Sequence, residues 1–189
     1  MTSTALFKHR ITVFVFALLM LVGPGYISAS HAGTAEEIDA SVNAALARFG
    51  EQVQGADDFL RSAEGVLIFP GVLQAGIGVG GEYGEGALRI HGKSVDYYNI
   101  ASASVGFQLG AQKKDVILVF MQDQALKDFR ASSGWKAGVD GSVVLIKVGA
   151  GGSIDTATIR DPIVGFVVGQ KGLMYNLSLE GSKVSRLDR

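Results

Sequence analysis

The chain has 189 residues, 48% of them hydrophobic and 19% charged, and it contains no cysteine. This apolar composition excludes an intrinsically disordered chain, and the length is sufficient for one domain with its own hydrophobic core. The lack of thiols excludes disulfides, thiolate metal ligands and cysteine nucleophiles.

Residues 1–32 have the pattern of a secretory signal peptide. Lys8 and Arg10 precede a run of apolar residues, and small residues ending at Ala32 fit cleavage after that position. The alternative is a retained membrane anchor, but the run is short for a span, which needs about 20 apolar residues. We therefore expect residues 33–189 to form a single exported domain, periplasmic and peripheral to a membrane.

Export would also change the charge balance. The signal peptide contains two basic residues and no acid, so the mature chain keeps 15 basic and 18 acidic side chains, a net charge of −3. Proteins that bind nucleic acid usually present strong positive charge. This balance argues against nucleic acid as the partner.

Three stretches have helical patterns. Thr34 and Glu37 have the spacing of a capping box at the start of a helix over residues 34–53, whose apolar side chains share one face. Arg48 is the only basic residue of this stretch, whereas helices on membrane surfaces usually carry several, so we expect the apolar face to cover a core. Shorter helices are expected at residues 56–63 and, with an aspartate cap, at 123–131.

Most of the remaining chain has strand patterns separated by turn residues. Residues 116–121 are apolar at every position, which predicts a central strand covered on both faces. The full set of expected strands is 66–69, 73–83, 86–91, 95–100, 101–112, 115–121, 136–149, 153–159, 163–170 and 172–180. The sequence thus predicts an α+β fold: a predominantly antiparallel, strongly curved β-sheet or barrel with N-terminal helices and one short internal helix.

The stretch 101–112 alternates strictly between apolar residues and small or polar ones, with glycines and serines but no charge on the second face. A face without large side chains allows another strand or a ligand to approach the backbone closely. Glycines also recur at every second position near residue 76. The candidate scaffold or groove residues are Gly76, Gly78, Gly80, Gly106 and Gly110.

No catalytic arrangement is visible in the sequence. Residues 76–81 match a dinucleotide fingerprint formally, but the following residues cannot begin the helix that this motif requires. Ser104 lies in a continuous strand pattern and not in a strand–turn–helix elbow. His91 is the only histidine of the mature chain and is interpreted as a surface turn residue. We therefore expect no enzyme activity, no cofactor and no metal site.

Basic residues follow the stretch 101–112. Lys113 and Lys114 form an expected turn, and Arg130 and Lys136 come later in the chain. Such a cluster could hold an anionic lipid headgroup by charge and hydrogen bonds, while solvated surface lysines are the alternative.

Several ordered motifs resemble the SYLF domain, a lipid-binding domain found in eukaryotes and in secreted bacterial proteins. The motifs are residues 63–70 (AEGVLIFP), the glycine run 76–86, Tyr98-Asn99, residues 104–112 (SVGFQLGAQ) and residues 135–138 (WKAG). The resemblance covers about Ile38 to Leu179. It implies binding of phosphoinositides or other anionic lipids, and no enzymatic activity.

In eukaryotic members the resemblance also implies roles in actin organisation and endocytosis. Those members begin with a basic amphipathic segment, where this chain has the signal peptide and an acidic helix from Thr34. Actin binding is therefore not expected here. The alternative function is a structural or protein-interaction module of the cell envelope without a lipid ligand.

Overall fold

A long β-hairpin dominates the fold. The computed structural model describes residues 33–146, 160–169, 172–173, 179 and 181–189, with the backbone alone at 77–79, 104–110 and 172–173. Strand β1 (Gly65–Ile90) pairs antiparallel with β2 (Lys93–Phe120), from Gly65 opposite Phe120 to Ile90 opposite Lys93. The turn between them has positive φ angles at both central residues, 49° at His91 and 78° at Gly92, as a tight two-residue hairpin requires.

The two strands are continuous where the sequence predicted six separate ones. Register shifts between Phe69 and Val72, Gly76 and Gly78, and Leu88 and Arg89 bend the strands without ending them. The turn expected around Lys113 and Lys114 was also wrong, because β2 runs through these residues.

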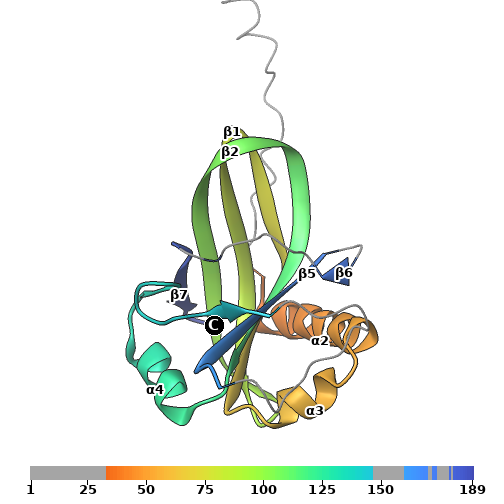
Figure 1. The fold of residues 1–189 in the computed structure, drawn as a ribbon, viewed down its shortest axis with the longest axis vertical. Helices are drawn as coiled ribbons and strands as arrows, with labels where there is room; N and C mark the ends of the chain where they lie inside the picture. The colour runs from red at the N-terminus through yellow and green to blue at the C-terminus, as the bar shows by residue number, and fades with distance from the viewer. Residues whose placement is uncertain (1–32, 147–159, 170–171, 174–178, 180) are drawn as a thin grey trace, which may run out of the picture. The chain divides into compact units, whose positions relative to one another are not determined.

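The hairpin folds back on itself. Figure 1 shows β1 and β2 rising together, curving over at the top and descending again. The descending limb of β1 comes so close to the first that a Cβ added to Gly86 would lie 1.9 Å from the carbonyl oxygen of Ile68. We call the curved part, residues 73–83 of β1 and 101–114 of β2, the arch.

Five short strands extend this hairpin into a seven-stranded mixed sheet. One group continues from the second limb of β2, and the other from its first limb. The first group is β5 (Ile163–Gly169) on β2, with β4 (Val144–Leu145) parallel and β6 (Gly172–Leu173) antiparallel to β5; the second is β7 (Lys183–Leu187) on β2, with β3 (Trp135–Lys136) on β7. The curled sheet forms a half-barrel and confirms the predicted α+β class.

Two hydrophobic clusters hold the layers together. The first is shared by both limbs of the hairpin and is closed by α4 (Asp123–Ala131); its members include Leu67, Phe69, Leu88, Tyr98, Val116, Leu118, Phe120, Phe129 and Trp135. The second lies under α2 (Ala35–Gln52) and α3 (Ala56–Arg61); its members include Ile38, Val42, Phe49, Phe59, Ile68, Ile117, Val119 and Phe166. Alternate residues of β2 enter the two clusters, so the prediction of a central strand covered on both faces is confirmed.

The helix predictions agree with the structure apart from one cap. In α2 the Glu37 backbone N–H donates to Thr34 Oγ1 at 3.2 Å, and the Thr34 N–H donates to Glu37 Oε2 at 2.9 Å, which completes the predicted capping box. The aspartate cap expected for α4 was wrong: Gln122 occupies the cap without a side-chain hydrogen bond, and Asp123 pairs with Lys127 one turn on. Within the described residues, the structure has no helix that is both long and apolar enough to cross a membrane.

The C-terminal half departs most from the strand predictions. The strand expected at 136–149 is interrupted, because Gly138 has a φ of +81° and the chain turns through Gly141 between β3 and β4. The strand β7 was not predicted, since residues 183–187 mix charged and apolar side chains. The expected strand 153–159 and most of 172–180 lie outside the described residues.

Tyr98 leads to a first prediction. Its hydroxyl is buried in the first cluster and, among the described residues, has no hydrogen-bond partner. Tyr98→Phe is expected to raise the free energy of unfolding by about 1 kcal/mol, because an unsatisfied buried group is removed while the ring contact with Phe129 stays. Urea unfolding at neutral pH measures this change.

The gain should grow in alkaline solution. Burial, and then the nearby Asp96 carboxylate, raise the pKa of Tyr98 above its ordinary value of 10.0. The unfolded tyrosine ionises at its ordinary pKa while the folded one stays neutral, so the wild-type protein loses stability as the pH rises above 10. If the difference in free energy of unfolding between Tyr98→Phe and the wild-type protein stayed constant across this pH range, the raised pKa of Tyr98 would be contradicted.

Candidate functional site

A groove of about 560 Å³ lies where α2 and α3 meet the hairpin. Its walls come from α2, from α3, from both ends of β1 and from the turn at His91. These segments are far apart in sequence, and they meet because the returning limb of β1 ends beside its own start: a Cβ on Gly65 would lie 3.5 Å from the Arg89 carbonyl oxygen. We call this space the helix–hairpin groove.

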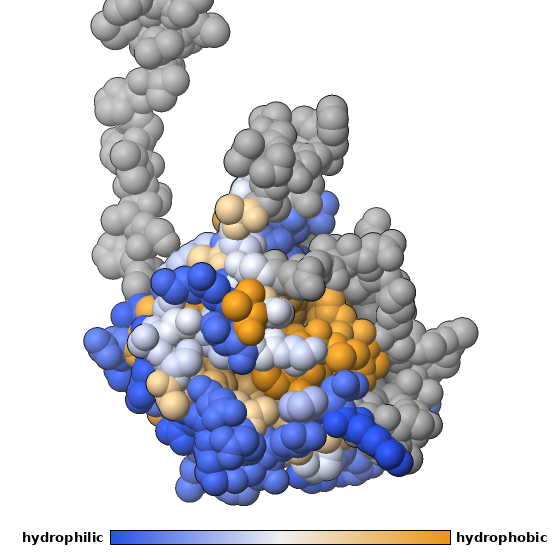
Figure 2. Space-filling view, turned by 60° about the vertical axis from the view of Figure 1, so that its left-hand side comes forward, coloured by the Kyte–Doolittle hydropathy of each residue, from blue (hydrophilic) through white to orange (hydrophobic). Residues whose placement is uncertain are grey.

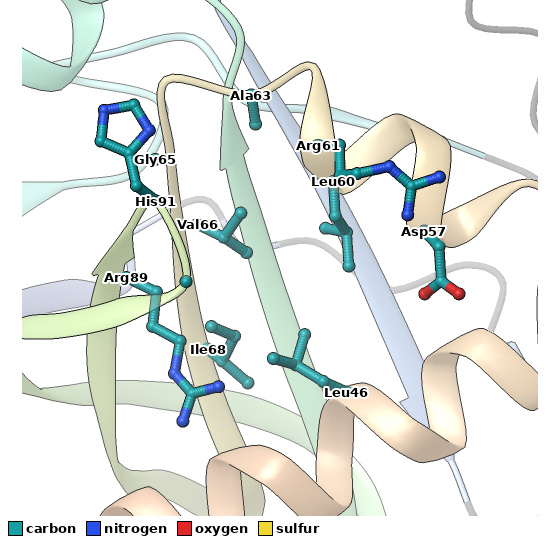
Figure 3. A pocket seen from close by; sticks show the side chains of 11 residues that line it. Leu46, Asp57, Leu60, Arg61, Ala63, Gly65, Val66, Ile68, Arg89 and His91 are labelled. Atoms are coloured by element: carbon teal, nitrogen blue, oxygen red, sulfur yellow. The ribbon is translucent and has the colours of Figure 1, made fainter.

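The floor of the groove is apolar. Figure 3 shows Val66, Ile68 and Leu46 between the hairpin side, with Arg89 and His91, and the helix side, with Leu60 and Arg61. Val66 and Ile68 belong to the cluster under the helices, and Leu46 and Leu60 pack against it partly buried. The floor therefore extends the hydrophobic core to the surface.

Basic side chains stand at the rim. Arg89 Nε donates a long hydrogen bond of 3.4 Å to Ser94 Oγ, and within the described residues its guanidinium forms no ion pair. Arg61 is exposed and pairs with Asp58 across one turn of α3. The hairpin side of the rim thus carries a cation without an acidic partner, while the helix side is already partly neutralised.

The size and lining of the groove indicate what kind of molecule it could hold. The groove is within the size range of pockets for small ligands, about 300 to 1,000 Å³. The eleven described residues that line it include no serine, threonine or cysteine that could serve as a nucleophile. An apolar floor beside an unpaired guanidinium suits an amphiphile whose polar end is acidic.

The structure separates the four lysines and arginines that the sequence proposed as headgroup contacts. Lys113 and Lys114 border a second, smaller pocket of about 290 Å³ beside α2. Lys114 is 2% exposed and its Nζ lies 2.8 Å from Glu82 Oε1, whereas Lys113 is exposed. In the same pocket Arg48 is 2.8 Å from the Asp115 carboxylate, which also accepts the Gly71 N–H.

Arg130 and Lys136 lie on α4 and β3, away from this pocket. Arg130 and Arg186 both pair with Asp96, a carboxylate that is only 5% exposed. Lys136 stands opposite Lys183 in the β3–β7 ladder, and both are exposed. Of the four predicted contacts, Arg130 and Lys114 already hold an acidic partner within the protein.

The predicted scaffold glycines face one another at the crown of the arch. The ladder pairs Gly76 with Gly110, Gly78 with Gly106, and Gly80 with Ser104. On either side of the crown Leu73, Tyr83 and Ala101 are exposed, while Gln74 and Lys114 are buried; Gln112, opposite Gln74, is exposed. Among the described side chains, the arch therefore carries its larger apolar residues on the outward face and its buried polar residues on the inward face.

The described residues thus form an α+β half-barrel with a two-layered core and a groove that has an apolar floor and a basic rim. Residues 101–188 match the family model Ysc84, described as Las17-binding protein actin regulator. This match covers 88 of the 189 residues and agrees with the SYLF family that the sequence motifs predicted. The family is known for lipid and actin-related roles and implies lipid or protein interaction in general. No curated protein matches the chain.

Sequence reasoning did not find the groove. Leu46 was correctly placed on the buried face of the first helix. Arg89 was not proposed as a site residue, because it lies within an expected strand, and His91 was interpreted only as a surface turn residue. The distance in sequence between these residues hides their meeting, since it depends on how the hairpin folds back. The unpaired positive charge at the end of a strand was the one available signal.

Proposed function

We propose that the exported domain is a non-enzymatic anionic-lipid-binding protein that holds a single acidic amphiphile in the helix–hairpin groove. The observation that carries this proposal is the apolar floor next to the guanidinium of Arg89, which forms no direct ion pair among the described residues and reaches the Asp39 carboxylate only through Ser94. The match of residues 101–188 to the model of a family with lipid-related roles supports it.

The floor provides the affinity for the hydrocarbon part. Each methylene group that leaves water for an apolar surface contributes about 0.8 kcal/mol. Leu46, Leu60, Val66 and Ile68 offer such a surface without closing it from solvent.

The rim selects the charge of the headgroup. An arginine side chain can donate two parallel hydrogen bonds to a carboxylate or phosphate, and Arg89 is available because no acid occupies it among the described residues. His91 adds a second polar side chain on the same side of the groove. The mature chain carries a net charge of −3, so this basic rim is a local exception to the overall charge.

One observation favours the alternative, a protein-interaction module of the envelope. Figure 2 shows an apolar patch bordered by hydrophilic side chains on one face of the molecule. Separately, Val139 and Val144 are 75% and 38% exposed. Apolar surface of this kind often marks contacts between proteins.

The second prediction tests the groove with cis-parinaric acid, a fluorescent fatty acid used as a monomer in solution. Arg89→Gln is expected to weaken its binding about tenfold, because a charge-assisted hydrogen bond to the carboxylate is lost. Fluorescence titration measures the affinity.

Lys93→Gln is the matched control, since Lys93 is an exposed cation at the same end of the hairpin but does not line the groove. It should bind the probe as the wild-type protein does. The proposal fails if the wild-type protein does not bind the probe, or if Arg89→Gln binds it equally well.

A further inference from the structure

The outer face of the arch has the reverse polarity of an ordinary exposed sheet. Leu73 and Tyr83 are 43% and 48% exposed on it, together with exposed alanines at 75, 101, 103 and 111. The inner face instead carries Gln74, Glu82 and Lys114, of which Gln74 is 6% and Lys114 2% exposed. A soluble sheet with one face in water normally shows the opposite alternation.

Polar groups on the inner face keep the arch in this orientation. The Lys114 ammonium and the Glu82 carboxylate meet across the two strands at 2.8 Å, and their side chains are 1% and 9% exposed. Turning the face over would expose this pair and bury the apolar residues. The apolar outer surface is therefore a fixed feature of the fold.

The edge of this surface carries the groups that suit a membrane interface. Lys113 lies opposite Leu73 in the ladder, is exposed, and within the described residues has no acidic partner. Tyr83, on the other limb, presents an apolar ring whose hydroxyl donates to Glu85 Oε1 at 2.8 Å. A lysine and a tyrosine beside an apolar surface match the boundary between headgroups and acyl chains of an anionic leaflet.

The backbone limits how deep such a contact can go. Among the described strands, β2 pairs with β7 as far as Ala101 and with β5 from Lys114 onward, so its outer edge across the arch has no further strand. Unpaired backbone groups are costly within the hydrocarbon core. The arch is therefore suited to the interfacial layer of one leaflet.

We propose that the outer face of the arch, with Leu73, Tyr83 and Lys113, is a surface that docks the domain on anionic bilayers. The proposal rests on the proposed function in taking an anionic lipid as the partner, but it uses a different surface. In Figure 1 the arch lies at the top of the folded-back hairpin, and α3, which borders the groove, lies at its base. Variants of one surface can therefore leave the other intact.

The test is flotation with vesicles of phosphatidylcholine containing phosphatidylglycerol, and with vesicles of phosphatidylcholine alone. We expect Leu73→Ser combined with Tyr83→Ser to weaken partitioning onto the mixed vesicles about tenfold, since two exposed apolar side chains no longer leave water. Lys113→Gln should reduce the preference for mixed over neutral vesicles. Both variants should bind cis-parinaric acid as the wild-type protein does.

Val95→Ser is the matched control, because Val95 is 42% exposed on β2 near the other end of the hairpin. It should partition like the wild-type protein. The docking proposal is overturned if the wild-type protein ignores mixed vesicles, or if the double variant floats unchanged. If the wild-type protein floats with mixed vesicles but does not bind cis-parinaric acid, only the proposal of a lipid site in the helix–hairpin groove is overturned.

Discussion

Gly86→Ala is expected to lower the free energy of unfolding by about 3 kcal/mol or more, because the added methyl group has no space. The added Cβ would lie 1.9 Å from the Ile68 carbonyl oxygen and 2.8 Å from a ring carbon of Phe69. The first of these atoms belongs to the backbone of the facing limb, which cannot move without opening the folded hairpin. Urea unfolding followed by circular dichroism measures the loss.

Gly81→Ala separates this steric effect from the general cost of changing a strand glycine. Its added Cβ would meet only the Ser102 carbonyl oxygen at 3.6 Å, an ordinary contact. Because alanine restricts the unfolded chain more than glycine does, this variant should be neutral or slightly stabilised. If both variants lost the same stability, the close contact between the two β1 limbs would not be the reason for a glycine at position 86.

The local features of the fold could be read from the sequence. The capping box at Thr34 depends on residues three apart, and the alternation of 101–112 on residues two apart, so both are visible without knowledge of the partner. The same is true of the apolar run at 116–120, whose burial on both faces is confirmed.

The return of the hairpin could not be read in the same way. A glycine in the sequence indicates that another segment can pack close to the backbone, but it does not identify that segment. The sequence singled out Gly76, Gly78 and Gly80, which the structure pairs with small residues of β2. Among the glycines whose surroundings the structure describes, the tightest contact is at Gly86. The register shift between Phe69 and Val72 looked like a strand end, because a bulge and a turn use similar residues.

The candidate site was beyond sequence reasoning for a related reason. Leu46 and Arg89 meet only because α2 packs across the base of the folded hairpin. The period of a strand does, however, separate Lys113 from Lys114, since neighbouring residues point to opposite faces. Treating the two as one basic turn missed that only one of them could meet a ligand outside the arch.

Lys114→Met is expected to lower the free energy of unfolding by about 3 kcal/mol, because it leaves the Glu82 carboxylate buried without its partner. The two side chains are 1% and 9% exposed and their charged atoms are 2.8 Å apart. Lys113→Met, one residue away on the exposed face, should change stability by less than about 0.5 kcal/mol. Urea unfolding of the two variants measures the contrast.

The double variant Glu82→Gln with Lys114→Met identifies the cause. When both charges are removed, no buried charge is left unpaired, and most of the lost stability should return. A lysine that instead held a lipid headgroup would give the opposite pattern: Lys114→Met would weaken flotation on mixed vesicles with little loss of stability, and removing Glu82 would restore nothing. The Lys114 variants therefore distinguish a structural ion pair inside the arch from a ligand contact, because the first role changes stability and the second changes vesicle binding.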